Sequence, residues 1–155
     1  MIAIRKATIN DLNRVVELFD RYRVFYKKGS DKQKAEEFLS QRIKINDSKI
    51  FIAEADNNNL VGFIQSYPLF SSTRMQRIWL LNDLFVDMEY RGKGIAKQLI
   101  DKAKNHCIQT NACGLILETE KKNVIGNELY PKVGFSLDEE HNYYTWDNNF
   151  INKKC

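Results

Sequence analysis

The apolar and polar positions of the chain follow two patterns, strand-like alternation in some segments and helical spacing in others. Alternating or continuously apolar runs predict strands at 2–7, 49–54, 60–69, 77–87, 114–118, 135–137 and 142–146. Apolar residues at helical spacing predict helices from 12 to 26, after 31, from 95 to 107 and after 123. We therefore expect an α+β fold with about seven strands and about four helices in mixed order.

Composition narrows the class of protein. A chain of 155 residues with 43% hydrophobic and 28% charged residues is typical of one globular domain, which we expect to span 1–155. The net charge of +4 comes from scattered basic residues, so we expect no nucleic-acid partner. No apolar run approaches the roughly 20 residues of a membrane helix, and the N-terminus lacks a signal segment. We expect a cytoplasmic protein without a membrane partner.

The cysteines indicate neither a metal site nor a disulfide framework. Cys107, Cys113 and Cys155 form no Cys-x-x-Cys pair, and no histidine lies at ligand spacing. An odd, sparse count is typical of reduced thiols in a cytosol. We expect no metal, with Cys107 and Cys113 in the core and the tail at 152–155 frayed.

A strand, a glycine-bearing loop and a helix follow one another at residues 80–107. The apolar run ends near Val86, the loop contains Gly92 and Gly94, and the helical pattern begins at Ile95. Unpartnered N–H groups at a helix N-terminus favour phosphate, and glycines allow its close approach. The residues of this loop match neither the P-loop motif nor the dinucleotide-binding motif Gly-x-Gly-x-x-Gly. A tight turn is the plain alternative.

Two motifs resemble those of one known family. Arg91-x-x-Gly94-x-Ala96, after Leu84-Phe85-Val86, resembles the acetyl-CoA loop of the GCN5-related N-acetyltransferases (GNAT). The block from Asn123 to Phe135, with Gly126, Tyr130 and Gly134, is similar to that family's second motif. The resemblance implies the GNAT fold: a twisted, mixed, mostly antiparallel sheet whose fourth and fifth strands splay apart, with acetyl-CoA entering from one side and the amine from the other.

The resemblance also implies roles for individual residues. Those expected to bind the cofactor are Phe85, Val86, Arg91, Gly92, Lys93, Gly94, Ile95, Ala96, Asn123 and Tyr130. A bulge near Leu84 would aim its N–H at the thioester carbonyl, and Tyr130 would donate a proton to the leaving sulfur. A packed aromatic is the alternative for Tyr130, and a helix N-cap is the alternative for Asn123.

The sequence leaves open which residue accepts the proton of the amine. An alkylamine has a pKa near 10.4, so a base or a desolvating pocket must deprotonate it. Several relatives with small-amine substrates have a glutamate where this chain has Asn82. Asp83 is the nearest carboxylate, but alternation places it on the opposite strand face unless a bulge rotates it. Glu118 and an ordered water chain are the other candidates.

The first predicted helix ends in aromatic residues that offer a wall for the acceptor. Tyr22 and Tyr26, together with Asn82 and Asp83, are the expected acceptor-binding residues, although core packing is the alternative for the two tyrosines. The segments 22–26, 67–72 and 81–86 resemble, more loosely, a subgroup of polyamine and histone acetyltransferases, whose members are often dimers. A homodimer is therefore one expectation.

These inferences predict an acetyl-CoA-dependent N-acetyltransferase. The acceptor would be a small primary amine, such as a polyamine or an amino acid, or the lysine side chain of a peptide. It would attack the thioester directly in a ternary complex. The alternative is a non-catalytic acyl-CoA-binding sensor or interaction module, because Asn82 cannot act as a base. Tyr130 argues against that alternative, since a binding module needs no proton donor there.

Overall fold

The computed structural model describes residues 1–148, and the chain forms two compact units, Met1–Glu118 and Thr119–Cys155. The expectation of a single domain over 1–155 stays a prediction. The expected frayed tail at 152–155, including Cys155, lies outside the described residues.

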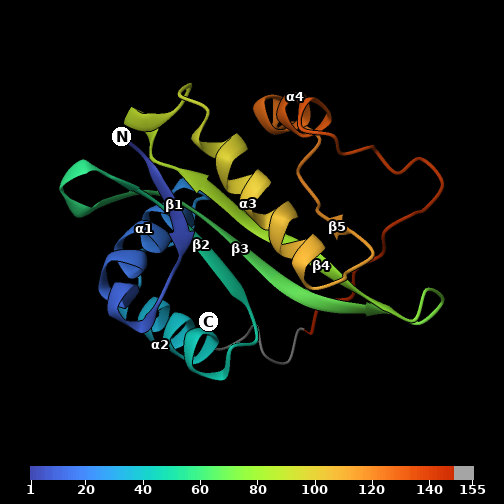
Figure 1. Cartoon of the computed structure of the whole chain (residues 1–155), viewed down its shortest axis with the longest axis horizontal. Coiled ribbons are helices and arrows are strands. Elements are labelled where there is room, and N and C mark those ends of the chain that lie inside the picture. Colours follow the sequence, from blue (N-terminus) through green and yellow to red (C-terminus); the bar gives the residue numbers. More distant parts are fainter. Residues whose placement is uncertain (149–155) are drawn as a thin grey trace. The chain divides into compact units, whose positions relative to one another are not determined.

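The first unit contains a five-stranded sheet in the order β1-β2-β3-β4-β5 (Figure 1). Its strands are β1 (Ala3–Lys6), β2 (Lys49–Ala55), β3 (Asn59–Ser71), β4 (Gln76–Val86) and β5 (Leu115–Ile116). Neighbours from β1 to β4 are antiparallel, whereas β5 is parallel to β4. The β4–β5 pairing is limited to Trp79 with Leu115 and Leu80 with Ile116. The part of β4 from 81 to 86 therefore has no strand partner on that side among the described residues.

The prediction of about seven strands is wrong for the described chain, which has five. Residues 135–137 and 142–146 are not in strands, and Leu137, Tyr143 and Trp146 are exposed. Alternation in sequence is a local signal, but a strand exists only where a second backbone accepts its hydrogen bonds, and a lone hairpin is marginally stable in water. The strand predicted at 114–118 is also shorter, at Leu115–Ile116.

The predicted helices are present as α1 (Leu12–Phe25), α2 (Lys32–Ile45), α3 (Ile95–Gln109) and α4 (Val124–Lys132), the last in the second unit. Single 3-10 turns are η1 (Ile9–Asp11), η2 (Asp56–Asn58) and η3 (Met88–Tyr90). Among residues 1–148, no helix has the length and apolar content that a membrane crossing requires.

Helices cover both faces of the sheet (Figure 1). Phe63 of β3 contacts Phe19 of α1 at 5.9 Å between ring centroids. A Cβ built on the preceding Gly62 would lie 3.3 Å from Leu99 of α3. Because adjacent strand residues point to opposite faces, α1 and α3 lie on opposite sides of the sheet.

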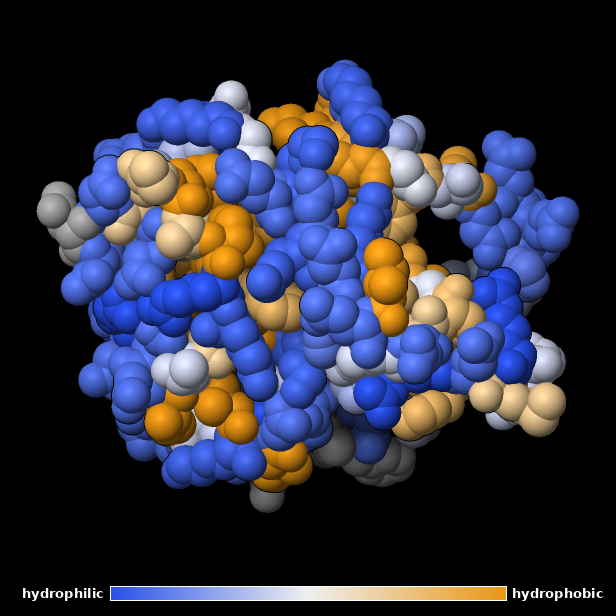
Figure 2. Space-filling view, viewed as in Figure 1, coloured by the Kyte–Doolittle hydropathy of each residue, from blue (hydrophilic) through white to orange (hydrophobic). Residues whose placement is uncertain are grey.

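Each helical layer buries an apolar face. The core beneath α1 and α2 includes Val15, Leu18, Phe19, Leu39, Ile52 and Phe63. The buried face of α3 consists of Ile95, Leu99, Ile100, Ala103 and Cys107. The outer surface over α3 is mainly hydrophilic, with small separate apolar patches (Figure 2). Cys107 is in the core as predicted, whereas Cys113, in the turn after α3, is only half-buried.

Candidate active site

A β-bulge in β4 organises the first part of the site. Gln65 of β3 pairs with Asp83 and Ser66 pairs with Leu81, so Asn82 is the extra residue on β4. The family resemblance implies a bulge near Leu84, and the structure has it two residues earlier, at Asn82. Leu84 itself is half-buried and pairs with Ile64.

The bulge changes which face of the sheet the β4 side chains occupy. Phe85 lies 6.0 Å from the ring of Tyr22 on α1, whereas Trp79 lies 4.8 Å from the ring of His106 on α3. In a regular strand, positions 79 and 85 would share one face. The switch occurs at Asn82, and it leaves Asp83 on the α1 face beside Tyr22.

Asp83 is a buried carboxylate, 5% exposed, that accepts three hydrogen bonds. Tyr22 Oη donates to Oδ1 at 2.8 Å, Asn82 Nδ2 to Oδ1 at 3.1 Å, and Gln65 Nε2 to Oδ2 at 2.9 Å. The Gln65 side chain, which is 0% exposed, accepts from Ser48 Oγ at 3.0 Å. These donors compensate the carboxylate for the loss of water. The predicted acceptor residues Tyr22, Asn82 and Asp83 therefore belong to one network.

Two tyrosines near Asp83 remain protonated over the ordinary pH range. Burial, followed by the charge of Asp83 and its hydrogen bond, raises the pKa of Tyr22 well above its usual value. Burial and the same charge also raise the pKa of Tyr67. Tyr22 is thus a permanent donor to the carboxylate. Tyr26, the other predicted wall residue, is exposed and meets the Tyr22 ring edge-on at 5.1 Å between centroids.

Sequence reasoning missed Gln65 and Tyr67 as neighbours of Asp83, and Ser48 as the partner of Gln65. A signal existed for Gln65, because it is a polar residue within the apolar run of β3. A buried amide needs partners, so such a residue marks a polar contact inside the core. Its partner could not be identified without the pairing of β3 with β4.

The predicted phosphate loop connects β4 to α3. Gly92 has φ +73° and Gly94 has φ +76°, in the left-handed region that favours glycine. Gly94 is the N-cap of α3, and no side chain caps this end of the helix. Ile95 is buried and Ala96 is half-buried, so the start of α3 is anchored in the core. Uncapped N–H groups, a helix dipole and two adaptable glycines fit a pyrophosphate.

Positive side chains of the loop are held by contacts within the first unit. Arg91 Nε donates to the carbonyl of Val86 at 2.9 Å, and its guanidinium lies 4.8 Å from the ring centroid of Phe25. Lys93 Nζ donates to the carbonyl of Glu89 at 3.1 Å. Arg91 therefore ties the loop to the end of β4 and to α1. The buried Phe85 ring packs against Tyr22, so the strand backbone is the part of Phe85 that could meet a cofactor.

The second unit contains the other two predicted site residues. Asn123 caps α4: its Oδ1 accepts from the N–H of Gly126 at 3.1 Å, and its Nδ2 donates to Thr119 Oγ1 at 2.9 Å. A Cβ at Gly126 would lie 2.6 Å from Asn123 Nδ2, so a larger residue there would displace the cap. The N-cap role anticipated for Asn123 is confirmed. Tyr130 is half-buried and meets Phe135 edge-on at 5.8 Å.

Comparisons with known proteins define the family. The model of the Acetyltransferase (GNAT) family matches residues 12–135, which include parts of both units. The chain belongs to this family. It is an N-acetyltransferase that uses acetyl-CoA, and the non-catalytic alternative is not favoured.

Individual relatives match most of the chain. It is 42% identical over 141 residues to the uncharacterized N-acetyltransferase YhfO of Bacillus subtilis, covering 91% of this chain and 94% of that protein. A probable acetyltransferase of Haemophilus influenzae is 30% identical over 141 residues, covering 90% and 93%. A crystal structure of a probable acetyltransferase, 34% identical, superposes with a TM-score of 0.91 and covers 95% of this chain and 98% of its own.

Among residues 1–148, no group of three or more His, Cys, Asp or Glu side chains could hold a metal ion.

Proposed function

We propose that the enzyme acetylates a primary amine by direct attack in a ternary complex, and that Asp83 anchors the amine. The observation that carries the proposal is the Asp83 network at the β4 bulge. It holds a buried carboxylate beside the stretch of β4 that lacks a strand partner among the described residues.

Asp83 suits an ammonium ligand. Tyr22, Asn82 and Gln65 occupy three of the roughly four lone-pair positions of its carboxylate. One acceptor position remains, on Oδ2, and a desolvated negative charge attracts a cation more strongly than an exposed one. The rings of Tyr22 and Tyr26 add faces that favour a cation. The amine would dock as the ammonium and lose its proton before it attacks.

The base that removes this proton has three candidates. Asp83 is the first. Glu118 is the second, although it is exposed and follows the end of β5 at Ile116. An ordered water chain is the third. Asn82 is not a candidate, because an amide binds protons too weakly, and its Nδ2 is a donor to Asp83.

The cofactor side of the proposal rests on the loop before α3. Acetyl-CoA supplies a thioester carbonyl that an amine nitrogen can attack. The N–H groups of Gly92, Lys93, Gly94, Ile95 and Ala96 would hold the pyrophosphate, with Arg91 beside them. The edge of β4 at Leu84, Phe85 and Val86, which has no strand partner among the described residues, would receive the pantetheine arm. The Leu84 N–H would polarise the carbonyl.

Residues of the second unit would complete the reaction. As the C–N bond forms and the C–S bond breaks, Tyr130 would donate its phenolic proton to the departing sulfur. Asn123 would contact the cofactor arm while its side chain caps α4.

A small amine or a lysine side chain is the proposed acceptor. The spermine/spermidine N(1)-acetyltransferase of Bacillus subtilis is 31% identical over 87 residues, covering 53% of this chain and 56% of that protein. Polyamines carry ammonium groups, which match the charge of Asp83. A homodimer and a cytoplasmic location remain part of the proposal.

The test combines a product screen with one variant. The enzyme is incubated with acetyl-CoA and a panel of polyamines, amino acids, aminoglycosides and a lysine peptide, and acetylated masses are read. For the acceptor found, Asp83→Asn should lower kcat/KM about a hundredfold and leave the KM for acetyl-CoA within about twofold.

The matched control is Asp20→Asn. Asp20 is also 5% exposed and also accepts hydrogen bonds, from Ser30 and Asp31, but it lies away from the bulge. The Asp20→Asn variant should lose stability without a change in the KM for the acceptor. Equal kinetic effects of the two variants would refute the anchor role. Tight binding of acetyl-CoA with no product from any amine would favour a sensor.

A further inference from the structure

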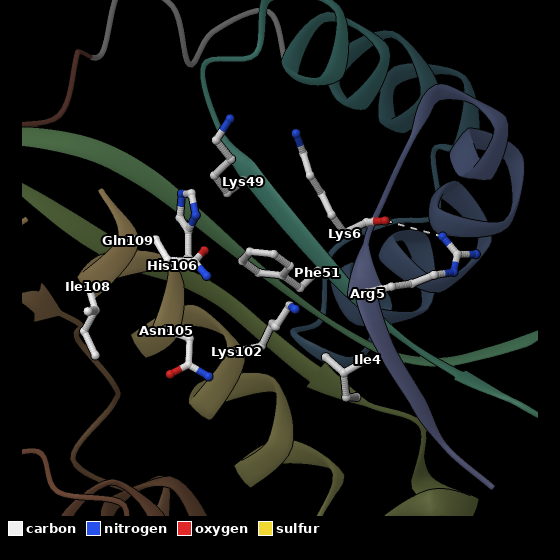
Figure 3. A pocket seen from close by; sticks show the side chains of 10 residues that line it. All are labelled: Ile4, Arg5, Lys6, Lys49, Phe51, Lys102, Asn105, His106, Ile108 and Gln109. Atoms are coloured by element: carbon white, nitrogen blue, oxygen red, sulfur yellow. Dashed lines mark hydrogen bonds between the residues drawn. The ribbon is translucent and has the colours of Figure 1, made fainter. Parts of the chain in front are cut away.

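A hollow lies on the α3 side of the sheet, between the C-terminal half of α3 and strands β1 and β2 (Figure 3). Its volume is about 600 Å³, which is enough for a small organic molecule. Phe51 of β2 and His106 of α3 form its floor, and Ile4 and Ile108 add apolar walls. None of these residues belongs to the acetyl-transfer site.

The charged residues that line this hollow are all basic. Lys6, Lys49 and Lys102 have no carboxylate partner among residues 1–148. Lys49 Nζ contacts the amide oxygen of Asn46, and Lys102 Nζ lies 5.9 Å from the ring centroid of Phe51. In Figure 3 the side chains of Lys6 and Lys49 extend to the same side.

A fourth basic residue, Arg5, is already neutralised. Its guanidinium donates to Asp11 and to Glu54 at distances of 2.7–2.9 Å. The uncompensated charge of the hollow therefore belongs to the three lysines.

His106 experiences this positive charge. Its ring lies 5.6 Å from Phe51 and 4.8 Å from Trp79 between centroids, and its buried Nε2 has no hydrogen-bond partner among the described residues. Burial, followed by the charges of Lys49, Lys6 and Arg77, lowers the pKa of His106. Burial and the charges of Lys6 and Arg77 also lower the pKa of Lys49. These cations repel one another, which costs free energy, and a bound anion would reduce that repulsion.

We propose that this hollow is a binding site for a small organic anion, with a phosphate or carboxylate group at Lys6 and Lys49 and an apolar or aromatic body against Phe51. The floor offers aromatic surface, and Lys102 supplies a further positive charge at the ring. The ligand class follows from this pairing of an apolar floor with cations that lack counter-charges.

The site is separate from the acetyl-CoA loop. The loop lies at the N-terminus of α3, and His106 is near its C-terminal end, about 17 Å along the helix axis. Asp83 is on the other face of the sheet, beside α1. An anion could therefore bind here while both substrates are present, as an effector would.

The experiment uses phenyl phosphate as the probe and the two imidazoles of the chain as reporters. The labelled full-length protein is saturated with CoA, so that the phosphate loop is occupied, and is titrated at constant ionic strength while the histidine NMR signals are followed. The His106 signals should shift to saturation, and those of His141, which pairs with Asp138, should not. Benzyl alcohol, which has no charge, should produce no saturable shift.

Charge-removing variants then locate the site. Lys6→Gln and Lys49→Gln should each weaken phenyl phosphate binding about fivefold. Lys44→Gln removes an equal charge from the exposed surface of α2 and should leave the affinity unchanged. An unmoved His106 signal would overturn the proposal. So would equal loss in the Lys44 and Lys49 variants, or benzyl alcohol binding as tightly as phenyl phosphate.

Discussion

The phenol of Tyr22 on α1 donates a 2.8 Å hydrogen bond to Oδ1 of Asp83 on β4. The same ring lies against Phe63 and Phe85 in the apolar core. One side chain thus joins the helical layer to the bulge of the central strand. The position of the Asp83 carboxylate consequently depends on the packing of the core as well as on β4 itself.

Tyr22→Phe keeps the ring and removes the donor. We expect the free energy of unfolding to fall by about 1–2 kcal/mol, because a buried carboxylate loses one of its donors. The acceptor KM should rise while the KM for acetyl-CoA stays constant. Urea denaturation and steady-state kinetics measure the two effects. Tyr26→Phe is the control, since Tyr26 is exposed and does not bond Asp83; a Tyr22 variant that behaves like it would contradict the prediction.

Gly94→Ala tests the backbone conformation of the phosphate loop. A Cβ at Gly94 meets nothing within 4 Å, so the effect comes from its φ of +76°. An alanine in this conformation costs about 1–2 kcal/mol, and relief of that strain would reorient the N–H groups before α3. We expect a raised Kd for acetyl-CoA, measured by calorimetry. Gly29→Ala is the control: its Cβ also meets nothing within 4 Å, and its φ is not positive, so affinity should be unchanged. Equal affinities of the Gly94→Ala and Gly29→Ala variants for acetyl-CoA would show that the loop does not bind the cofactor.

The Asp11–Glu54 cluster determines how stability responds to acid. Hydrogen bonds from Arg5 hold the pKa of Asp11 far below its usual range, and those from Arg5 and Arg14 lower the pKa of Glu54. A carboxylate with a lowered folded-state pKa stabilises the fold above its unfolded value, near 3.9 to 4.3, and this contribution is lost as pH falls through the folded pKa. The cluster therefore stabilises at neutral pH and weakens in acid.

Asp11→Asn should lower the free energy of unfolding by about 1–2 kcal/mol at pH 7, a value reduced because both arginines are partly exposed. The difference from the unmodified protein should shrink below about pH 4. Urea denaturation at pH 7, 5 and 3 measures it. Asp101→Asn, which breaks only the surface pair with Lys97, should change stability by less than about 0.5 kcal/mol at every pH. A loss of stability in Asp11→Asn that grows as the pH falls would contradict the stabilising role of the cluster at neutral pH.

Tyr130→Phe tests proton donation to the leaving sulfur. Loss of the phenolic O–H should lower kcat about a hundredfold and change the Kd for acetyl-CoA little, because donation is needed only as the C–S bond breaks. Stopped-flow or steady-state assays and calorimetry supply the two numbers. Tyr143→Phe, at an exposed position, is the control. Equal losses of turnover and affinity in the Tyr130 variant would refute the acid role.

Local signals in the sequence predicted much of the fold. The spacing of Thr8 and Asp11 predicts a capping box, and in the structure the Thr8 N–H donates to Asp11 Oδ2 at 2.8 Å. The hairpin of β2 and β3 and the start of α3 after Gly94 also agree with the pattern. Each of these features depends on residues within one turn or one hairpin, which is the range over which residue spacing carries information.

The number of strands was not predictable in the same way. The apolar residues at 135–137 and 142–146 have the composition of strands, but the described structure gives their backbones no ladder. Pairing is a property of two segments, so a segment read alone cannot reveal it.

Residue patterns alone were enough to indicate the family, the glycine loop before α3, the helices, most strand positions and the residue types from which a site could be built. The position of the bulge at Asn82 and the contacts of Asp83 with Tyr22 and Gln65 became visible only in the folded chain. The pattern could not reveal them because β4 is apolar on both faces. Moving the bulge by two positions would leave the hydrophobic pattern of β4 unchanged. Only the register with β3 therefore selects which β4 side chains face α1.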